Sequence, residues 1–253
     1  MDFIRERVLS GEFMVGAWCN LGSSLTVEMA ARIGYDWILL DQEHGPGDNL
    51  TLLHQMQAAQ AGKAAPIVRI AWNEMPRFKR ALDLGAKGIM IPYVQNAEEA
   101  RMAVDSMRYS PEGLRGVASS PRAAGFGREF DKYYAEANRS LLTVVQIETG
   151  DALDNLESIA AVDGVDVLFV GPLDLSVSLN MPARFDDLAF REVLSKVAEA
   201  AKAADKAAGI LLPGTDLIEL VRSLGFTFVA AGSDGGMVVN GFNQSFEALS
   251  RYK

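Results

Sequence analysis

Short apolar runs alternate with helix-like segments along most of the chain. The runs are almost continuously apolar, as strands buried on both faces are, and they lie at residues 14–20, 37–40, 66–70, 88–93, 141–148, 165–170, 208–212 and 226–231. Helical spacing recurs between them, for example in Ala100, Ala103, Val104 and Met107. Strands that alternate with helices in this way predict a parallel sheet.

A weak internal repeat supports this reading of the pattern. Each unit runs from a helix through a glycine and one or two further residues to an apolar strand, with Gly34, Gly85, Gly164 and Gly225 at the glycine position. A glycine placed there ends a helix in the left-handed conformation before the chain returns to the sheet. Eight such units in 253 residues match the size of a closed (β/α)₈ barrel. We therefore predict a single TIM-barrel domain over residues 1–253.

An open doubly wound sheet is the alternative architecture. Its G-x-G-x-x-G turn is missing after the first run, where Leu21-Gly22-Ser23-Ser24 stands instead. Residues 108–139 interrupt the alternation with a segment rich in Gly, Ala and Arg, and a loop of that length is typical of a functional or interface segment. From Gly235 onward, the spacing of Phe242, Phe246 and Leu249 indicates a final amphipathic helix.

Composition and charge narrow the classes of function. Hydrophobic residues make up 49% of the chain, and 24 basic against 33 acidic residues give a formal charge of −9. An acidic surface repels nucleic acid, and no apolar run approaches the roughly 20 residues that span a membrane. Residues 1–7 are charged and lack the apolar core of a signal peptide. The single cysteine, Cys19, excludes an intramolecular disulfide and is expected in the core, so we expect a cytoplasmic protein.

Polar side chains cluster where the predicted strands end. In a parallel barrel the reactive rim is the carboxyl edge of the strands. Asp41, Glu43 and His44 directly follow the run at 37–40, and the chain turns away at Gly45-Pro46. The other strands bring further polar groups to the same rim: Arg69, Gln146, Glu148, Asp174, Ser233 and Asp234.

Glu148 and Asp174 are the candidate metal ligands. Two carboxylates at adjacent strand ends, without a cluster of cysteine or histidine, suit a hard divalent ion such as Mg²⁺ or Mn²⁺. The alternative is that each acid caps the helix that follows it. A helix starting at Gly171-Pro172 would also aim backbone N–H groups into the mouth, where they suit a carboxylate.

Arg69 and His44 each have two interpretations. Arg69 lies inside an apolar strand and needs a partner; it either forms a structural ion pair with Asp41 or Glu43 or faces an oxyanion that develops during reaction. His44 lies beside two acids and either transfers a proton during reaction or only hydrogen-bonds in its loop, whereas His54, on a helix, is expected only to hydrogen-bond. Schiff-base chemistry would need a lysine within a strand, and all lysines fall on predicted helices, turns or the tail.

In their order along the chain, these residues resemble the HpcH/HpaI aldolase family, the metal-dependent 4-hydroxy-2-oxoacid aldolases. The resemblance covers nearly the whole chain. Its motifs are Gly34-Tyr35-Asp36-Trp37 with Asp41-x-Glu43-His44, Val68-Arg69, Leu84-Gly85-Ala86-x-Gly88-Ile89-Met90-Ile91-Pro92, Arg108-Tyr109 with Gly113-x-Arg115-Gly116, Gln146-Ile147-Glu148-Thr149, and Gly171-Pro172-x-Asp174-Leu175.

The resemblance implies a role for each matching residue. Glu148 and Asp174 hold the metal (Mg²⁺ or Mn²⁺, with Co²⁺ as a further option) and no organic cofactor is needed. His44 is the catalytic acid or base, Asp41 supports it, and Arg69 contacts the keto oxygen. Asp83 is contributed by a neighbouring subunit, because the family assembles as hexamers built from trimers with exchanged C-terminal helices. The substrate is bound by Gln146, Gly171, Pro172 and the amides of Leu173 and Asp174, and Trp18, Leu212 and the loop 117–128 face the aldehyde portion.

The implied reaction is the reversible retro-aldol cleavage of a 4-hydroxy-2-oxoacid. A base removes the 4-hydroxyl proton, the C3–C4 bond breaks, and pyruvate enolate held by the metal and Arg69 remains beside an aldehyde. The alternatives are a citrate-lyase-like acyl-CoA lyase and a non-catalytic barrel that binds an oxoacid. The expected partners are therefore a small oxoacid, an aldehyde and further copies of the chain.

Overall fold

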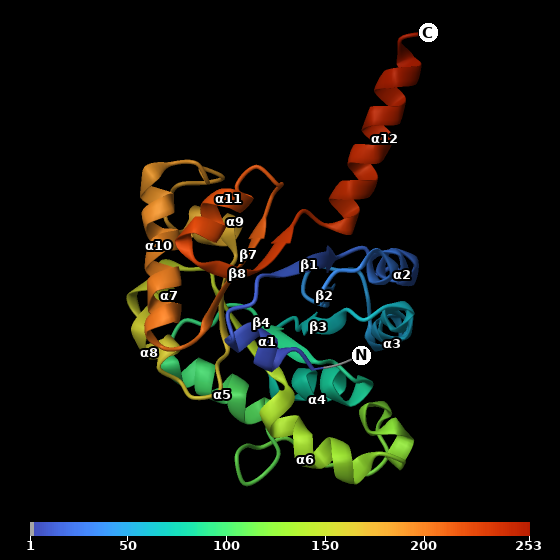
Figure 1. The fold of residues 1–253 in the computed structure, drawn as a ribbon, viewed down its shortest axis with the longest axis vertical. Helices are drawn as coiled ribbons and strands as arrows, with labels where there is room; N and C mark the ends of the chain where they lie inside the picture. Colours follow the sequence, from blue (N-terminus) through green and yellow to red (C-terminus); the bar gives the residue numbers. More distant parts are fainter. Residues whose placement is uncertain (1–2) are drawn as a thin grey trace.

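The computed structural model describes residues 3–253, so Met1 and Asp2 of the charged N-terminal segment lie outside it. Over that range eight parallel strands pair in chain order and close into a barrel (Figure 1). The strands are β1 (Met14–Cys19), β2 (Trp37–Asp41), β3 (Ala65–Arg69), β4 (Gly88–Ile91), β5 (Leu142–Ile147), β6 (Val167–Val170), β7 (Ala207–Leu212) and β8 (Phe226–Ala231). The (β/α)₈ prediction is confirmed, and the open doubly wound alternative is wrong.

Helices cover the outside of the barrel and follow the strands in turn. They are α1 (Arg5–Leu9), α2 (Ser24–Ile33), α3 (Asn49–Ala58), α4 (Met75–Leu84), α5 (Ala97–Met107), α6 (Phe130–Ser140), α7 (Gly150–Asp154), α8 (Leu156–Ala160), α9 (Pro172–Ser178), α10 (Leu188–Ala203), α11 (Ile218–Leu224) and α12 (Asp234–Ser250), with 3₁₀ turns at η1 (Ala59–Ala61) and η2 (Arg122–Gly127). Gly34, Gly85 and Gly225 end α2, α4 and α11 with φ of 110°, 108° and 101°, as the repeat predicted. Gly164 is left-handed as well, with φ of 92°, but it lies beyond the end of α8, whose C-cap is Ala161.

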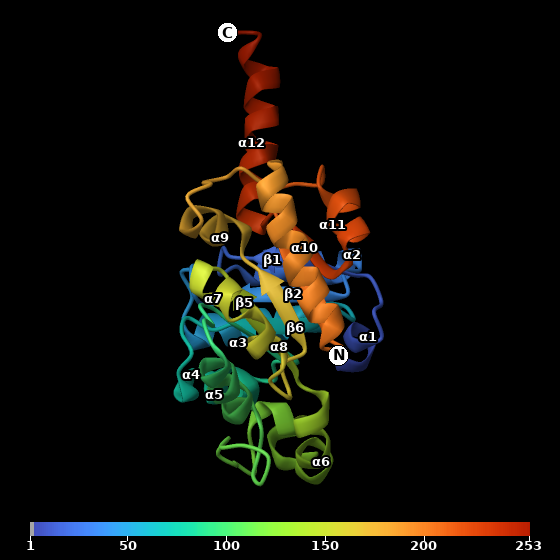
Figure 2. The same cartoon turned by 90° about the vertical axis from the view of Figure 1, so that its left-hand side faces the viewer.

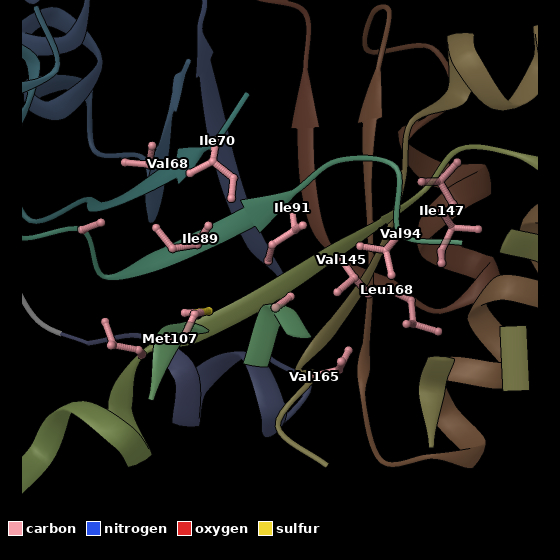
Figure 3. Close-up of a cluster of buried hydrophobic side chains, with 14 of the residues drawn as sticks. Val68, Ile70, Ile89, Ile91, Val94, Met107, Val145, Ile147, Val165 and Leu168 are labelled. Atoms are coloured by element: carbon pink, nitrogen blue, oxygen red, sulfur yellow. The ribbon is translucent and has the colours of Figure 1, made fainter. Parts of the chain in front are cut away.

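The strand side chains pack alternately against the helices and into the barrel interior. Figure 3 shows part of the outer cluster, which includes side chains of β3 to β6 and Met107 at the end of α5. Inside the barrel, the rings of Trp37 and Phe228 stack with centroids 4.0 Å apart. Ile4 and Val8 of the N-terminal segment join this inner cluster, so α1 covers the N-terminal end of the barrel.

The final helix leaves the barrel instead of packing against it. In both ribbon views α12 projects from the body (Figures 1 and 2). Its start is held by Asp234, whose carboxylate accepts hydrogen bonds from the Asn20 N–H at 2.8 Å and the Thr26 hydroxyl at 2.6 Å. The amphipathic helix predicted from Gly235 onward is therefore present, and Asp234 secures it rather than serving the rim. Large apolar side chains of α12 are exposed: Met237, Val238, Val239, Phe242, Phe246 and Leu249.

None of the helices in the described part of the chain combines the length and apolar character needed to cross a bilayer.

Residues 108–139, which interrupt the alternation of strands and helices, fold at the opposite end of the barrel from α12 (Figure 1). There η2 lies against the turn between α4 and β4, and Arg122 donates a hydrogen bond to the Leu84 carbonyl at 2.6 Å.

We predict that Gly16→Ala destabilises the barrel by about 1–3 kcal/mol or more. A Cβ at this position would lie 2.1 Å from the ring of Trp37, which is fully buried and cannot move aside. Urea unfolding should therefore show a lower midpoint. Gly241→Ala on α12 is the matched control, since nothing lies within 4 Å of its added Cβ. Equal midpoints for the two variants would contradict the role assigned to the Trp37 stack.

Candidate active site

The polar rim residues meet in a cavity of about 480 Å³ at the carboxyl end of the strands. Of the predicted site residues, it is lined by Trp18, Asp41, His44, Arg69, Gln146, Glu148, Gly171, Pro172, Leu173, Asp174 and Leu212. The fold brings them together because the carboxyl ends of all strands of a parallel barrel open on one side. Ser233, expected at the rim, lines it as well. The cavity also includes residues that the sequence did not single out: Asn20, Phe169, Phe185, Leu211, Pro213, Gly232 and Gly236.

Arg69 is fixed at the floor of this cavity by two acids. Strand pairing sets Asp41 of β2 beside Arg69 of β3. The Arg69 Nε and Nη2 groups donate to the two Asp41 oxygens at 3.0 and 2.5 Å, and Nη1 lies 2.9 Å from Glu43 Oε2. Burial alone would raise the pKa of Asp41, but the hydrogen bonds from Arg69 outweigh it, and the net pKa is lowered. Arg69 therefore has both the structural ion pair and a place in the cavity.

His44 stands at the mouth, with its side chain 65% exposed. Its imidazole Nε2 lies 3.8 Å from Glu43 Oε1. Asp41 contacts His44 through the backbone, accepting the His44 N–H at 3.2 Å and the Glu43 N–H at 3.0 Å. Glu43, rather than Asp41, is thus the carboxylate that faces the imidazole. Burial raises the pKa of Glu43 above its ordinary value.

Glu148 is a buried carboxylate held from two sides. It accepts a hydrogen bond from Gln146 Nε2 at 2.5 Å and another from the Tyr93 backbone N–H at 3.2 Å. Tyr93 adopts a left-handed φ of 54°, a conformation that is costly for a bulky residue. Burial, together with the charges of Asp174 and Glu43, raises the pKa of Glu148 to about 8.

The helix-capping interpretation of the two acids is wrong. The side chain of Thr149, not Glu148, caps α7 by accepting the Ala152 N–H. At α9 the N-cap residue is Gly171, and Asp174 lies inside the first turn with no such bond. Both carboxylates are therefore free of the structural role that competed with metal binding.

The residues around Glu148 fit a divalent metal ion. A Cβ at Gly171 would lie 2.3 Å from Glu148 Oε1, so glycine leaves space beside this carboxylate. Gln146 Oε1 is buried without a hydrogen-bond partner, and oxygen donors are the ligands that Mg²⁺ and Mn²⁺ prefer. No three His, Cys, Asp or Glu side chains within residues 3–253 converge into a complete metal site. Glu148 and Asp174 would therefore need water or substrate oxygens to complete the coordination.

Two other predictions point to residues far from this cavity in the same chain. Asp83 lies near the end of α4, where its Oδ1 accepts a hydrogen bond from buried Arg115 at 3.0 Å. The loop 117–128 includes η2, at the amino end of the barrel. The expectation that this loop faces the aldehyde portion is wrong for the chain's own cavity, because the connection from α5 to β5 turns at that end. A contribution of Asp83 to a neighbouring subunit stays a prediction.

The residues missed in the sequence left weak signals there. Asn20 and Pro213 directly follow strands β1 and β7, so the rule that drew attention to strand ends could have included them. Phe169 belongs to β6 and faces inward, where its ring lies 5.9 Å from that of Trp18. Phe185 comes from the connection between α9 and α10 and had no signal in the sequence.

Comparisons with known proteins agree with this geometry. Residues 14–241 match the family model described as HpcH/HpaI aldolase/citrate lyase. The chain is 39% identical to pyruvate aldolase of Rhizobium etli, over 95% of this chain and 94% of the relative. It is 41% identical to 5-keto-4-deoxy-D-glucarate aldolase of an Enterobacter species, over 89% and 88% of the two chains. The crystal structure of an HpcH/HpaI aldolase/citrate lyase family protein from Burkholderia cenocepacia superposes with a TM-score of 0.92 at 34% identity and 98% coverage of both chains.

We predict that metal-free protein becomes less stable as pH rises from about 4.5 to about 8. Because the folded-state pKa of Glu148 is raised from 4.5 to about 8, the folded protein holds a proton there that the unfolded chain has released. The contribution of Glu148 to the unfolding free energy should fall by up to about 1.4 kcal/mol per pH unit. Glu148→Gln should remove this slope in urea titrations with EDTA present. Parallel pH dependences for wild type and variant would refute the assignment.

Proposed function

The chain belongs to the HpcH/HpaI aldolase/citrate lyase family, and we propose that it cleaves a 4-hydroxy-2-oxoacid reversibly into pyruvate and an aldehyde with the help of a divalent metal ion. It is a carbon–carbon lyase, a pyruvate-dependent class II aldolase. One observation carries the proposal: Arg69, His44 and the carboxylate pair Glu148 and Asp174 line one cavity.

Glu148 and Asp174 would hold the metal ion, with Gln146 beside them. A divalent ion bound there would chelate the carboxylate and keto oxygens of the substrate and polarise the carbonyl. The two acids need a cation for an electrostatic reason as well. Glu148 is buried near the charges of Asp174 and Glu43, and a positive ion relieves their repulsion. Mg²⁺ and Mn²⁺ are the ions we propose, with Co²⁺ as a further option and no organic cofactor.

Arg69 would stabilise the negative charge that develops on the keto oxygen. Its hydrogen bonds to Asp41 and its ion pair with Glu43 fix the guanidinium in advance, so little reorganisation is needed when the enolate forms. Its Cζ also lies 4.7 Å from the centre of the Trp18 ring. Asp41 thus acts as the residue that positions Arg69.

His44 would take the proton from the 4-hydroxyl group as the C3–C4 bond breaks and return it in the synthetic direction. Its exposed position at the mouth suits exchange of that proton with solvent, and Glu43 Oε1 lies 3.8 Å from its Nε2. The backbone N–H groups of Leu173 and Asp174, in the first turn of α9, would bind the substrate carboxylate. Gly171 and Pro172 shape that turn.

The other functions considered from the sequence have less support. A non-catalytic oxoacid-binding barrel would be expected to lack one of the groups named above, and all of them line the cavity. The family model covers citrate lyases as well as aldolases, so an acyl-CoA lyase is the nearest alternative. The two relatives described above, at 39% and 41% identity, are both named aldolases. A cytoplasmic location stays a prediction.

The exposed apolar face of α12 supports assembly into a trimer or hexamer with exchanged C-terminal helices. Phe242 is 73% exposed and Leu249 is 68% exposed, which is unusual for a helix that packs on its own barrel. Helix α2 exposes a complementary apolar row at Leu25, Met29 and Ile33. In such an assembly Asp83 of one subunit would complete the cavity of the next.

We predict that Arg69→Ala lowers kcat by roughly 10²–10³ and that His44→Gln lowers it by roughly 10²–10⁴. The assay is pyruvate release from a panel of 4-hydroxy-2-oxoacids with Mg²⁺ or Mn²⁺, and EDTA should abolish the activity. Arg101→Ala and His54→Gln are matched controls, because both side chains are exposed on helices away from the cavity.

Metal binding is measured separately from turnover. Calorimetric titration of Mn²⁺ should detect binding to wild type and to Arg69→Ala, but not to a Glu148→Gln/Asp174→Asn double variant. Near-normal turnover of Arg69→Ala would remove this residue from the mechanism, and unchanged Mn²⁺ binding in the double variant would refute the ligand assignment.

We predict that Phe242→Asp combined with Phe246→Asp breaks the assembly. Charges in an apolar interface are strongly unfavourable, so light scattering after gel filtration should give a smaller mass than for wild type. Gln244→Asp is the control on the same helix, since its exposed side chain lies on another face from the two phenylalanines. A monomeric wild type at micromolar concentration would contradict the proposal.

A further inference from the structure

We propose that Asn20 binds the aldehyde half of the substrate, and that this chain selects uncharged, hydroxylated aldehydes over aldehydes that carry a carboxylate. The inference rests on the proposed aldolase function and names the substrate class of that same cavity. It follows from where the remote end of the substrate lies, from the free carboxamide of Asn20, and from the distribution of charge.

The barrel order places the aldehyde half on the β1 side of the cavity. The carboxylate end of the substrate belongs with Glu148 and Asp174, which follow β5 and β6. In the closed barrel β1 and β2 lie across the mouth from these strands. A substrate that extends from Glu148 past Arg69 on β3 therefore points toward the β1 side of the cavity, which Asn20 lines.

The side-chain carboxamide of Asn20 lies on that side of the cavity, and its oxygen has no hydrogen-bond partner among the described residues. Its backbone N–H is held by Asp234 Oδ1 at 2.8 Å, so the residue has a fixed position. Its side chain makes no hydrogen bond to any described residue, and its Oδ1 is buried without a partner. A Cβ at Gly235 would come within 3.0 Å of that oxygen, so glycine makes room for it. A buried amide oxygen without a partner is costly. A substrate hydroxyl that reaches this half-buried side chain can donate to the oxygen and accept from the NH₂ group.

The surroundings of Asn20 are apolar, with one further neutral polar group. Trp18, Leu212, Pro213 and Phe185 line the same cavity. Ser233 Oγ accepts the Gly236 N–H at 3.2 Å and so can still donate its own proton. Carbon groups of an aldehyde would pack against the apolar residues, and a hydroxyl would find both a donor and an acceptor.

The charges of the cavity disfavour a second carboxylate. Among its described lining residues, Arg69 is the sole Arg or Lys, against the acids Asp41, Glu148 and Asp174. The Arg69 nitrogens already face Asp41 and Glu43. Within this chain, a carboxylate on the aldehyde half would lose water without gaining an Arg or Lys partner, which is a large cost.

The test is aldol addition of pyruvate, with Mn²⁺, to matched pairs of aldehydes. Lactaldehyde against propanal isolates the hydroxyl, and 4-oxobutanoate against butanal isolates the carboxylate. We expect kcat/KM for lactaldehyde to exceed that for propanal roughly tenfold, the effect of about one hydrogen bond. We expect 4-oxobutanoate to react at least about tenfold less efficiently than butanal. A wild type that prefers 4-oxobutanoate overturns the proposal.

Variants of Asn20 link this preference to the residue. Asn20→Ala should bring the lactaldehyde-to-propanal ratio close to one, and Asn20→Lys should raise the 4-oxobutanoate-to-butanal ratio by about tenfold or more. Each ratio is taken within one variant, so a loss of folded protein cancels. Asn49→Ala, exposed at the start of α3, should keep both wild-type ratios. Unchanged ratios in both Asn20 variants overturn the proposal.

Failure of the aldolase function itself has a different signature. Exchange of the C3 protons of pyruvate for deuterium reports enolate formation without any aldehyde. Wild-type exchange with Mn²⁺, together with a preference for the charged aldehyde, refutes the Asn20 subsite alone. Absence of exchange, together with no addition to any of the four aldehydes, refutes the proposed function.

Discussion

The buried cation of Arg69 is the interaction on which the rest of the cavity depends. A guanidinium inside a barrel strand is tolerated only because Asp41 accepts two of its hydrogen bonds and Glu43 lies 2.9 Å from a third nitrogen. The same two acids shape the loop after β2, since Asp41 also accepts the N–H groups of Glu43 and His44. The Arg69–Asp41 ion pair therefore fixes the position of Arg69. Through Asp41 it also fixes the backbone of Glu43 and His44.

The opposite wall carries a buried carboxyl group, Glu148, whose ionised form no cation of the described chain pairs with. Burial raises the pKa of Glu148 to about 8, and Asp174 and Glu43 add to this effect. The left-handed Tyr93 and the side-chain-free Gly171 both serve Glu148, one by donating its N–H and the other by leaving space. Local strain of this kind persists where the surrounding fold imposes it, and here it holds a carboxylate ready for a cation.

Asp234 connects the cavity wall to the projecting helix. Its carboxylate binds the backbone of Asn20, the Thr26 hydroxyl of α2 and the first turn of α12. The direction of α12 and the position of Asn20 therefore depend on one buried group. Assembly through α12 and recognition of the aldehyde half would thus share a structural support, although they involve different surfaces.

The architecture and most of the cavity follow from the sequence alone. Apolar runs and helix-ending glycines determine a parallel barrel, and a parallel barrel must gather Asp41, Arg69, Glu148 and Asp174 at one rim. Tertiary structure decided the pairings among them: that Glu43 faces the imidazole, that a Tyr93 amide holds Glu148, and that loop 117–128 folds at the other end. Periodicity reports which face of an element is buried, whereas a hydrogen-bond partner depends on side-chain rotamers and loop paths that no local pattern encodes.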